Sequence, residues 1–349
     1  MKNKFSTFLK IVIPIALATV ILWWMYRDTN WQEIVDGMSS DKMNWTWMLL
    51  SLPFGITAQV FRGLRWKLAL EPLGENPRYS TCTNAIFLSY GSSLVVPRVG
   101  ELLRCGVLKR YDDISLSHSV GTVVTERCID MLIILVLSAV TVFLQIPIFA
   151  RIASETGLSL DSIFGKFTAA GYFVTFSCLL LIGLMGWWLS RKWNIFQRTR
   201  GVLKELREGL FSIRFIRSRF LFIVYSFGIW VSYFLHFYLT FYCFAYSEHL
   251  GVVVALVAFV VGTFAVLVPT PNGAGPWHFA VKTVLVLYGV GQSDAVAFVL
   301  IVHTVQTALV ALLGLYSCVA LGFTKKVERV DDNEQQVPLN VRFIKRLNV

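Results

Sequence analysis

Charged side chains are scarce in this chain. Only 15% of its 349 residues are Asp, Glu, Lys or Arg, whereas 56% are hydrophobic and the mean hydropathy is +0.63. An ordinary soluble domain has about 25% charged residues, so the composition excludes that class and indicates an integral membrane protein. Apolar runs of about 18 residues or more indicate membrane-spanning helices, because barrel strands give only short alternating segments. We therefore expect an all-α polytopic membrane protein.

Paired cysteines and metal-binding spacings are also absent from the sequence. The six cysteines form no C-x-x-C pair and mostly lie in apolar runs, so we expect small buried hydrophobic residues and no disulfide framework. His236, His278 and His303 are too scattered for a metal site, and His236 and His303 are expected to be satisfied core polar groups. No soluble catalytic domain is recognisable. The sequence therefore predicts no enzyme activity, no cofactor and no metal.

Basic residues outnumber acidic ones by 11, but they lie in short segments beside apolar runs, which argues against a nucleic-acid partner. With a cytoplasmic N-terminus, 25 of the 32 Lys and Arg residues fall in segments assigned to the cytoplasm, namely 1–10, 62–80, 104–110, 191–219 and 324–349. This is the positive-inside pattern of membrane proteins. We expect a multi-pass protein of the cell inner membrane with both termini in the cytoplasm.

Six apolar runs are predicted to be full membrane spans: 11–26, 44–61, 119–147, 166–190, 220–246 and 294–322. The first run follows a basic start, as in a signal peptide, but its only small-residue cleavage pattern lies inside the run, so we expect an uncleaved helix. Segment 191–219 has nine basic and two acidic residues interleaved with apolar ones. It predicts a cytoplasmic amphipathic linker helix on anionic lipid, with a regulatory docking site as the alternative.

Proline and glycine interrupt two further hydrophobic regions. Residues 81–111 are broken at Pro97, and residues 252–290 are broken at 269–276. The orientation of the neighbouring spans requires the first region to begin and end inside and the second to begin and end outside. The half-helices after the breaks have about 14 residues, too few to cross comfortably. We therefore expect two re-entrant hairpins, with pairs of full crossings as the alternative.

The hairpins give the sequence an internal symmetry. Units 44–147 and 220–322 each contain a span, a hairpin and a span, in opposite orientations, which is an inverted-topology plan common among transporters. We expect one transmembrane domain over residues 1–323 and a cytoplasmic polar tail over 324–349. A broken helix persists inside a membrane only where it is buried in protein or lines a polar cavity. The two breaks therefore predict one site.

The first break places charged side chains where lipid favours apolar ones. Arg98, Glu101 and Arg104 lie at i, i+3 and i+6 of a helix that Pro97 is expected to open. The free N–H groups and positive dipole end of such a helix, flanked by arginines, suit an anion such as phosphate. The alternative is an internal ion-pair clamp that only holds the hairpin.

The second break combines a tight turn with a helix that Pro276 is expected to open. Its candidate binding residues are Asn272, Gly273, Gly275, His278 and Lys282. Lys282 would face lipid only at considerable cost, so it is expected to point into the protein or a cavity. A lysine that snorkels to the outer interface is the alternative.

Two carboxylates interrupt the span 119–147 near its cytoplasmic end. Glu126 and Asp130 share a helix face at i, i+4, and Arg127 can pair with Asp130 at i+3. They could relay a proton, bind a cation or form structural ion pairs with the arginines of the first hairpin. Arg62 and Arg65, which end the span 44–61, are candidates for the same ion pairs, with a cytoplasmic anchor beside an interfacial tryptophan as the alternative.

Four motifs resemble the lysylphosphatidylglycerol synthase transmembrane-region family, which includes the flippase half of the bacterial multiple peptide resistance factor. They are RGLRW (62–66), PRVGELLR (97–104), ERCID (126–130) and PTPNGAG (269–275), and their order and spacing agree over residues 40–322. The resemblance implies movement of a lipid or lipid-linked group between leaflets. It does not imply aminoacyl transfer, because that activity belongs to a separate soluble domain.

The chain departs from this family at two positions. Asn272 replaces a glycine of the second break, and His278 occupies the position of the family's usual glutamate. The family's usual substrate, and any proton coupling through that glutamate, therefore do not carry over from the resemblance.

Three functions remain open on the sequence. The leading hypothesis is a flippase-like transporter whose partner is an anionic membrane phospholipid or a lipid-linked anion. The second is a transporter or channel for a small soluble anion. The third is an enzyme acting on a lipid-linked phosphate, with Glu126, Asp130 or His278 as acid or base. The oligomeric state is also open, a homo-oligomer included.

Overall fold

The structure is a computed structural model that describes residues 43–96, 99–156, 216–268 and 270–327, with a few positions between 16 and 32. Its helices are α3 (Trp45–Leu70), α4 (Tyr79–Ser93), α5 (Val99–Asp112), α6 (Leu116–Thr156), α10 (Arg219–Tyr238), α11 (Gly251–Ala265), α12 (Pro276–Leu287) and α13 (Gln292–Gly322). Short 3-10 turns lie at Glu71–Leu73, Leu239–Cys243, Glu248–Leu250 and Pro271–Gly273. Within these ranges, extended pairing is limited to one bridge between Met43 and Phe244. The all-α class is confirmed.

Four helical segments of the described part are long and apolar enough to cross a membrane. Three match predicted spans, namely Leu116–Gln145, Arg219–Cys243 and Gln292–Gly322. The fourth, Glu248–Ala265, is the first arm of the second broken region, which the sequence pattern assigns to a half-helix. The helix α3 is long enough at about 39 Å, but it is less apolar than these four. Most of the expected span 11–26, all of 166–190, most of the linker 191–219 and most of the tail lie outside the described residues.

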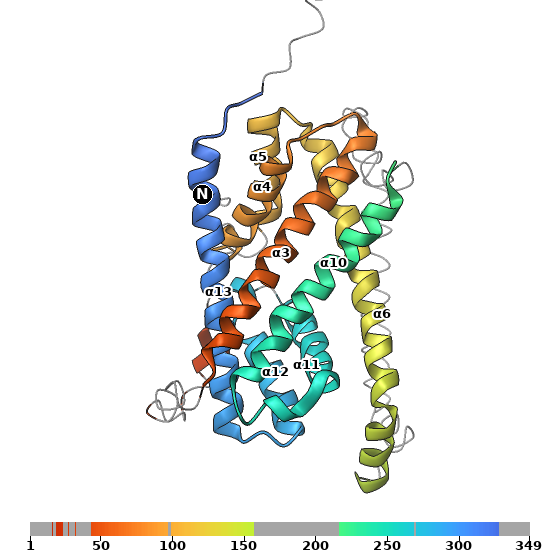
Figure 1. Ribbon diagram of the computed structural model, residues 1–349, viewed down its shortest axis with the longest axis vertical. Coiled ribbons are helices and arrows are strands. Elements are labelled where there is room, and N and C mark those ends of the chain that lie inside the picture. Colours follow the sequence, from red (N-terminus) through yellow and green to blue (C-terminus); the bar gives the residue numbers. More distant parts are fainter. Residues whose placement is uncertain are drawn as a thin grey trace, which may run out of the picture.

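Helices α3 and α10 lie side by side as an antiparallel pair at the centre of the bundle (Figure 1). The start of α3 is capped by the side chain of Asn44, and just before it Met43 meets Phe244 beyond the end of α10. About two turns further along α3, His236 donates from Nδ1 to the Ser51 carbonyl oxygen at 2.8 Å. This hydrogen bond satisfies the buried imidazole within the core, as expected.

The first broken region forms the antiparallel pair α4 and α5. Just before α4, Arg78 donates to Asp112 at the end of α5 through its backbone N–H (2.8 Å) and its Nε (2.7 Å). Near the break, Gly100 of α5 lies so close to Ser89 of α4 that any Cβ would overlap the Ser89 carbonyl oxygen. Residues 97 and 98, at the break itself, lie outside the described residues.

The second broken region forms the pair α11 and α12. Gly262 of α11 packs against the Trp277 ring of α12, where a Cβ would lie 2.9 Å from the indole nitrogen. The turn between them has three residues with positive φ, namely Asn272 (50°), Gly273 (72°) and Gly275 (89°). This left-handed backbone favours glycine and tolerates asparagine. The predicted turn and the start of α12 at Pro276 are confirmed.

Helix α13 links the two helix pairs, with the first pair beside its C-terminal end and the second pair beside its N-terminal end (Figure 1). Arg78, at the open end of the first pair, donates to the carbonyl oxygen of Lys325 just beyond α13 at 2.9 Å. The second pair lies at the other end, because α12 leads through a short turn into the start of α13. The two pairs therefore reach into the bundle from opposite ends.

Both breaks lie near the middle of α13. At the second break, Asn272 Nδ2 donates to Thr307 Oγ1 at 2.7 Å. At the first, Gly91 of α4 packs on Gly314, where a Cβ on Gly91 would lie 2.8 Å from the Gly314 Cα. Thr307 and Gly314 are separated by about 10 Å along the helix at 1.5 Å per residue. The breaks are therefore neighbours in the fold, although they are far apart in sequence.

Packing between the halves follows one repeated pattern. The first helix of each pair contacts the long helix of the other unit: α4 contacts α13, and α11 contacts α6. The second helix of each pair contacts the long helix that follows it in the chain, α5 with α6 and α12 with α13. This is the relation expected for inverted units 44–147 and 220–322. Re-entry of each pair from one membrane face stays a prediction.

Two segments assigned to the cytoplasmic side by their basic residues lie within helices. Helix α3 continues past 61 to Leu70, and residues 104–110 lie inside α5. As a result Arg62, Arg65 and Arg104 are buried rather than solvated. Carboxylates from α6 neutralise these three arginines, and the membrane face to which the two segments belong stays a prediction.

Candidate functional site

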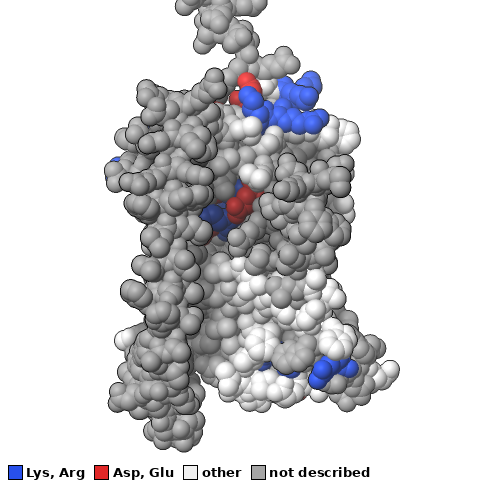
Figure 2. Space-filling model, turned by 180° about the vertical axis from the view of Figure 1, so that it is seen from behind, with Lys and Arg blue, Asp and Glu red and all other residues white. Residues whose placement is uncertain are grey.

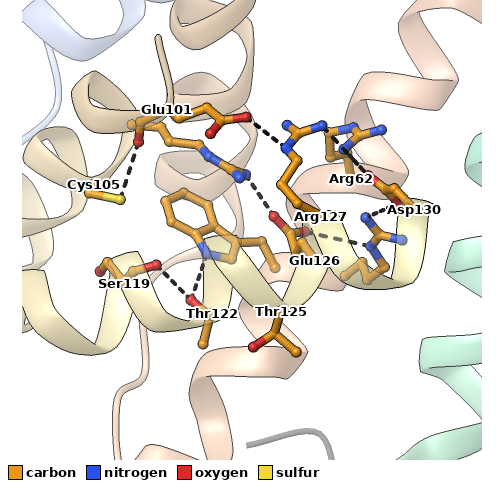
Figure 3. A network of polar contacts seen from close by, with 12 residues as sticks. Arg62, Glu101, Cys105, Ser119, Thr122, Thr125, Glu126, Arg127 and Asp130 are labelled. Carbon is orange, nitrogen blue, oxygen red and sulfur yellow. Dashed lines mark hydrogen bonds and ion pairs between the residues drawn. The ribbon is translucent and has the colours of Figure 1, made fainter. Parts of the chain in front are cut away.

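Seven charged side chains from three helices meet in one network (Figure 3). All seven are predicted site residues: Arg62 and Arg65 from α3, Glu101 and Arg104 from α5, and Glu126, Arg127 and Asp130 from α6. Spacings of three or four residues place the members from each helix on one face. Through α5, the network joins the first helix pair to α3 and α6.

The centre of the network is buried. Asp130 accepts hydrogen bonds from Arg62 Nη1 and Arg65 Nη2, each at 2.8 Å. Glu126 accepts one from Arg104 Nη1 at 2.8 Å and lies 3.5 Å from Arg65 Nε. These five side chains are at most 6% exposed. Removing one partner from such a pair leaves an uncompensated buried charge, which is strongly destabilising.

The edge of the network is exposed. Arg127 Nε and Glu101 Oε1 are 2.7 Å apart, and their side chains are 40% and 38% exposed. Figure 2 shows acidic and basic side chains in a recess about midway along the face seen from behind.

Glu101 and Arg104 pair with residues of α6 and not with each other. The expected clamp within α5 is therefore not formed by these two residues. Arg98 lies outside the described residues.

Trp66 is part of the network rather than an interfacial anchor. It is fully buried, its ring faces the Arg104 guanidinium at 4.6 Å, and its Nε1 donates to Thr122 Oγ1 at 3.0 Å. The interpretation as a membrane-surface tryptophan is therefore wrong. A cation–π contact with a desolvated arginine is worth about 2 kcal/mol, so Trp66 helps to hold Arg104.

Two tyrosines adjoin the other end of the network. The Arg62 guanidinium lies 5.8 Å from the ring centroids of both Tyr90 (α4) and Tyr233 (α10), and the two hydroxyl groups are 3.4 Å apart. Sequence analysis does not identify these residues, nor Thr122. They lie on separate helices and belong to no local motif, so only the tertiary packing brings them together.

The second break forms its own polar cluster on α13. The Asn272 carbonyl oxygen accepts from His303 Nε2 at 3.1 Å, and Thr307 Oγ1 lies 3.3 Å from His303 Nδ1. The buried ring of His278 lies 4.3 Å from that of His303, and its Nδ1 accepts from the Gly275 N–H at 3.3 Å. His303 is therefore hydrogen-bonded, as expected of a core polar residue. Its role in fixing the second break is not evident from the sequence.

The remaining predicted residues of the second break play backbone roles or lie apart. Gly273 fits against Val266, where a Cβ would lie 2.8 Å from the valine side chain. Lys282 is partly buried on α12. Within the described ranges it forms no ion pair with either cluster. The structure thus brings Asn272, Gly273, Gly275 and His278 together and leaves Lys282 separate.

Metal-binding geometry is absent from the described residues, where no three His, Cys, Asp or Glu side chains are grouped to hold an ion. Five cysteines are described, and all are free. Cys82, Cys105 and Cys243 are buried as expected, but Cys128 and Cys318 are exposed on the surface of the chain. For those two, the prediction of burial is wrong, because they lie on outer faces of α6 and α13.

Apolar helices around a buried charged network, with two broken regions meeting beside one long helix, define an all-α multi-pass membrane protein with an internal polar site. The chain belongs to the lysylphosphatidylglycerol synthase TM region family, whose model matches residues 11–314. The resemblance inferred from the four motifs is thus confirmed. No curated protein matches the chain.

Proposed function

We propose that this protein is a flippase-like transporter that moves an anionic phospholipid, or a lipid-linked anion, between the leaflets of the inner membrane without changing it chemically. The observation that carries the proposal is a charge imbalance. Among the described residues, the buried centre of the network has three guanidinium groups and two carboxylates. A surplus positive charge is costly inside a membrane protein, and an entering anionic head group would offset it.

The placement of the two breaks supports a moving head group. Both lie beside the middle of α13, and the helix pairs that carry them come from opposite ends of the bundle. Rocking of one unit against the other would therefore change access to a site between them, as in other inverted-repeat transporters. Family membership supports a lipid-related function at the level of the transmembrane region.

Leaflet exchange in proteoliposomes tests this proposal. Vesicles containing a fluorescent anionic phospholipid are treated with a membrane-impermeant quencher, which removes only the signal of the outer leaflet. Protein-containing vesicles should lose the inner-leaflet signal, whereas empty vesicles should retain it. Equal retention in both samples would contradict the proposal.

Two further measurements on the same vesicles separate the alternatives. Leakage of an encapsulated soluble anion without lipid exchange would support a soluble-anion transporter or channel instead. A new lipid species seen by mass spectrometry after incubation with lipid extract would support an enzyme instead. Unchanged lipids together with leaflet exchange support the flippase.

A further inference from the structure

Among the described residues, one edge of the Arg104 guanidinium group has no protein partner. Its Nη1 donates to Glu126, whereas Nε and Nη2 are buried and have no hydrogen-bond partner among the described residues. The side chain is only 1% exposed. A buried charged donor that stays unsatisfied costs more than a neutral one, so native proteins rarely leave two on one group.

The unpartnered atoms have the geometry of an oxyanion site. Nε–H and Nη2–H point from the same side of the planar guanidinium and form a fork that matches two oxygens of a carboxylate or phosphate. The face of the group is covered by Trp66, which Thr122 holds in place. Because Nη1 already binds Glu126, the Nε–Nη2 edge is the part of the group that remains for a ligand.

The other buried arginines of the network are more fully engaged. Arg65 contacts Asp130, Glu126 and Ser226 through its three nitrogens. Arg62 binds Asp130 and lies against two tyrosine rings. Arg104 is therefore the member with the most unused donors. The surplus of one positive charge in the buried centre is most readily neutralised at this residue.

We infer that the Nε–Nη2 edge of Arg104 binds the singly charged phosphodiester of a lipid head group and thereby selects phosphodiesters over phosphomonoesters. The inference rests on the proposed function and specifies its substrate class. One negative charge matches the surplus of one, whereas a phosphomonoester carries about −1.5 to −2 at neutral pH and would leave excess negative charge in the buried centre. Two non-bridging oxygens of the diester match the two donors.

Lipid binding to the purified full chain, measured by native mass spectrometry, tests this inference. The probes are phosphatidylglycerol, a singly charged phosphodiester; phosphatidic acid, a phosphomonoester with the same acyl chains; and glycerophosphoglycerol, the diester without acyl chains. The wild type should bind phosphatidylglycerol more tightly than phosphatidic acid. Equal or tighter binding of phosphatidic acid would overturn the inference, and this comparison needs no variant.

Arg104→Lys tests the fork itself. Lysine keeps a positive charge that can face Glu126 but lacks the two parallel donors. We expect phosphatidylglycerol binding to weaken on the order of 10- to 100-fold, as for loss of one charge-assisted hydrogen bond. The matched control is Arg78→Lys, because Nε and Nη2 of Arg78 already bind protein oxygens of Asp112, Tyr111 and Lys325. Wild-type binding by folded Arg104→Lys would overturn the inference.

The third probe, glycerophosphoglycerol, distinguishes a lipid phosphodiester from a soluble one. Preference for the lipid over glycerophosphoglycerol supports a membrane substrate. Equally tight binding of the soluble diester, lost in Arg104→Lys, supports the fork but contradicts the lipid specified here.

Leaflet exchange by the same proteins separates this inference from the proposed function. If Arg104→Lys loses phosphatidylglycerol binding while even the wild type exchanges no lipid, the binding site stands and the transport function fails. If the wild type exchanges lipid and Arg104→Lys binds and exchanges equally well, transport stands and the assignment of Arg104 fails.

Discussion

Asp130 balances most of the buried charge of the network. Each of its two oxygens accepts a hydrogen bond from a different arginine of α3, and Arg127 Nη1 lies 3.7 Å away. One carboxylate thereby fixes α3 against α6 at a depth where water cannot compensate for a lost partner. Its removal should affect stability more than the removal of any exposed carboxylate of the described chain.

Asp130→Asn should destabilise the fold by about 3–5 kcal/mol, because the amide keeps the shape of the carboxyl group and leaves Arg62 and Arg65 short of a counter-charge. The thermal unfolding of the purified protein in detergent measures this effect. Asp113→Asn is the control: Asp113 pairs with Lys109 across side chains that are 33% and 50% exposed, and such pairs are worth about 0–1 kcal/mol. Equal shifts in both variants would contradict a structural role for Asp130.

Sequence reasoning could identify the charged residues of the network and offered the α6 carboxylates as partners of the arginines, which the structure confirms, but it did not decide between these pairs and a clamp within α5. Carboxylates and arginines in an apolar helix must be compensated, so Glu126, Asp130 and Arg104 are recognisable from their context. Local spacing suggests that Arg104 pairs with Glu101, yet both reach across to α6. The rotation of α5 against α6 decides the pairing, and it depends on contacts such as Gly100 on Ser89 that no periodic pattern encodes.

At the scale of elements, close helix contacts depend on individual glycines. In α5, Gly100 touches the backbone of α4, whereas Gly106 has no atom within 4 Å of the position of a Cβ. The same substitution at these two positions therefore has opposite consequences. The difference isolates packing from helix propensity, because both residues belong to one helix.

Gly100→Ala should destabilise the pair α4 and α5 by about 1–3 kcal/mol, since the added methyl group would overlap a backbone carbonyl that cannot move independently. Gly106→Ala should be neutral or stabilising by up to about 1 kcal/mol, because alanine favours helix and nothing is displaced. Thermal unfolding of the two variants under one condition gives the comparison. Loss of stability in Gly106→Ala alone would show that the packing of α5 is wrong.

Element boundaries show where local patterns are insufficient. The start of α12 follows from Pro276 and the glycine-rich turn, and it is predicted correctly. The end of α3 is not, because arginines normally mark the cytoplasmic end of a span. Here α6 supplies the compensating carboxylates, so the helix continues with Arg62 and Arg65 buried. A charge in one helix can be interpreted only once its partner helix is known.

At the scale of the whole molecule, the open ends of the two helix pairs should lie on opposite sides of the membrane. Ser80, in the first turn of α4, and Ser293, in the first turn of α13, are both exposed and mark these two ends. Ser293→Cys should react with a membrane-impermeant maleimide in intact cells, whereas Ser80→Cys should react only after the membrane is opened. The background has Cys128, Cys178 and Cys318 replaced by alanine. Labelling of both cysteines from the same side would contradict the inverted arrangement.

Position 95 separates a re-entrant first pair from two full crossings. Val95 lies just after α4 and is 69% exposed, so a cysteine there would not disturb the core. The 15 residues of α4 span about 22 Å at 1.5 Å per residue, against about 30 Å for the hydrocarbon core of a bilayer. The break should therefore stop inside the membrane, and Val95→Cys should stay unreacted in intact cells where Ser293→Cys reacts. If Val95→Cys is labelled as fully as Ser293→Cys, then α4 and α5 each cross the membrane, and the first break cannot hold a head group at the membrane interior.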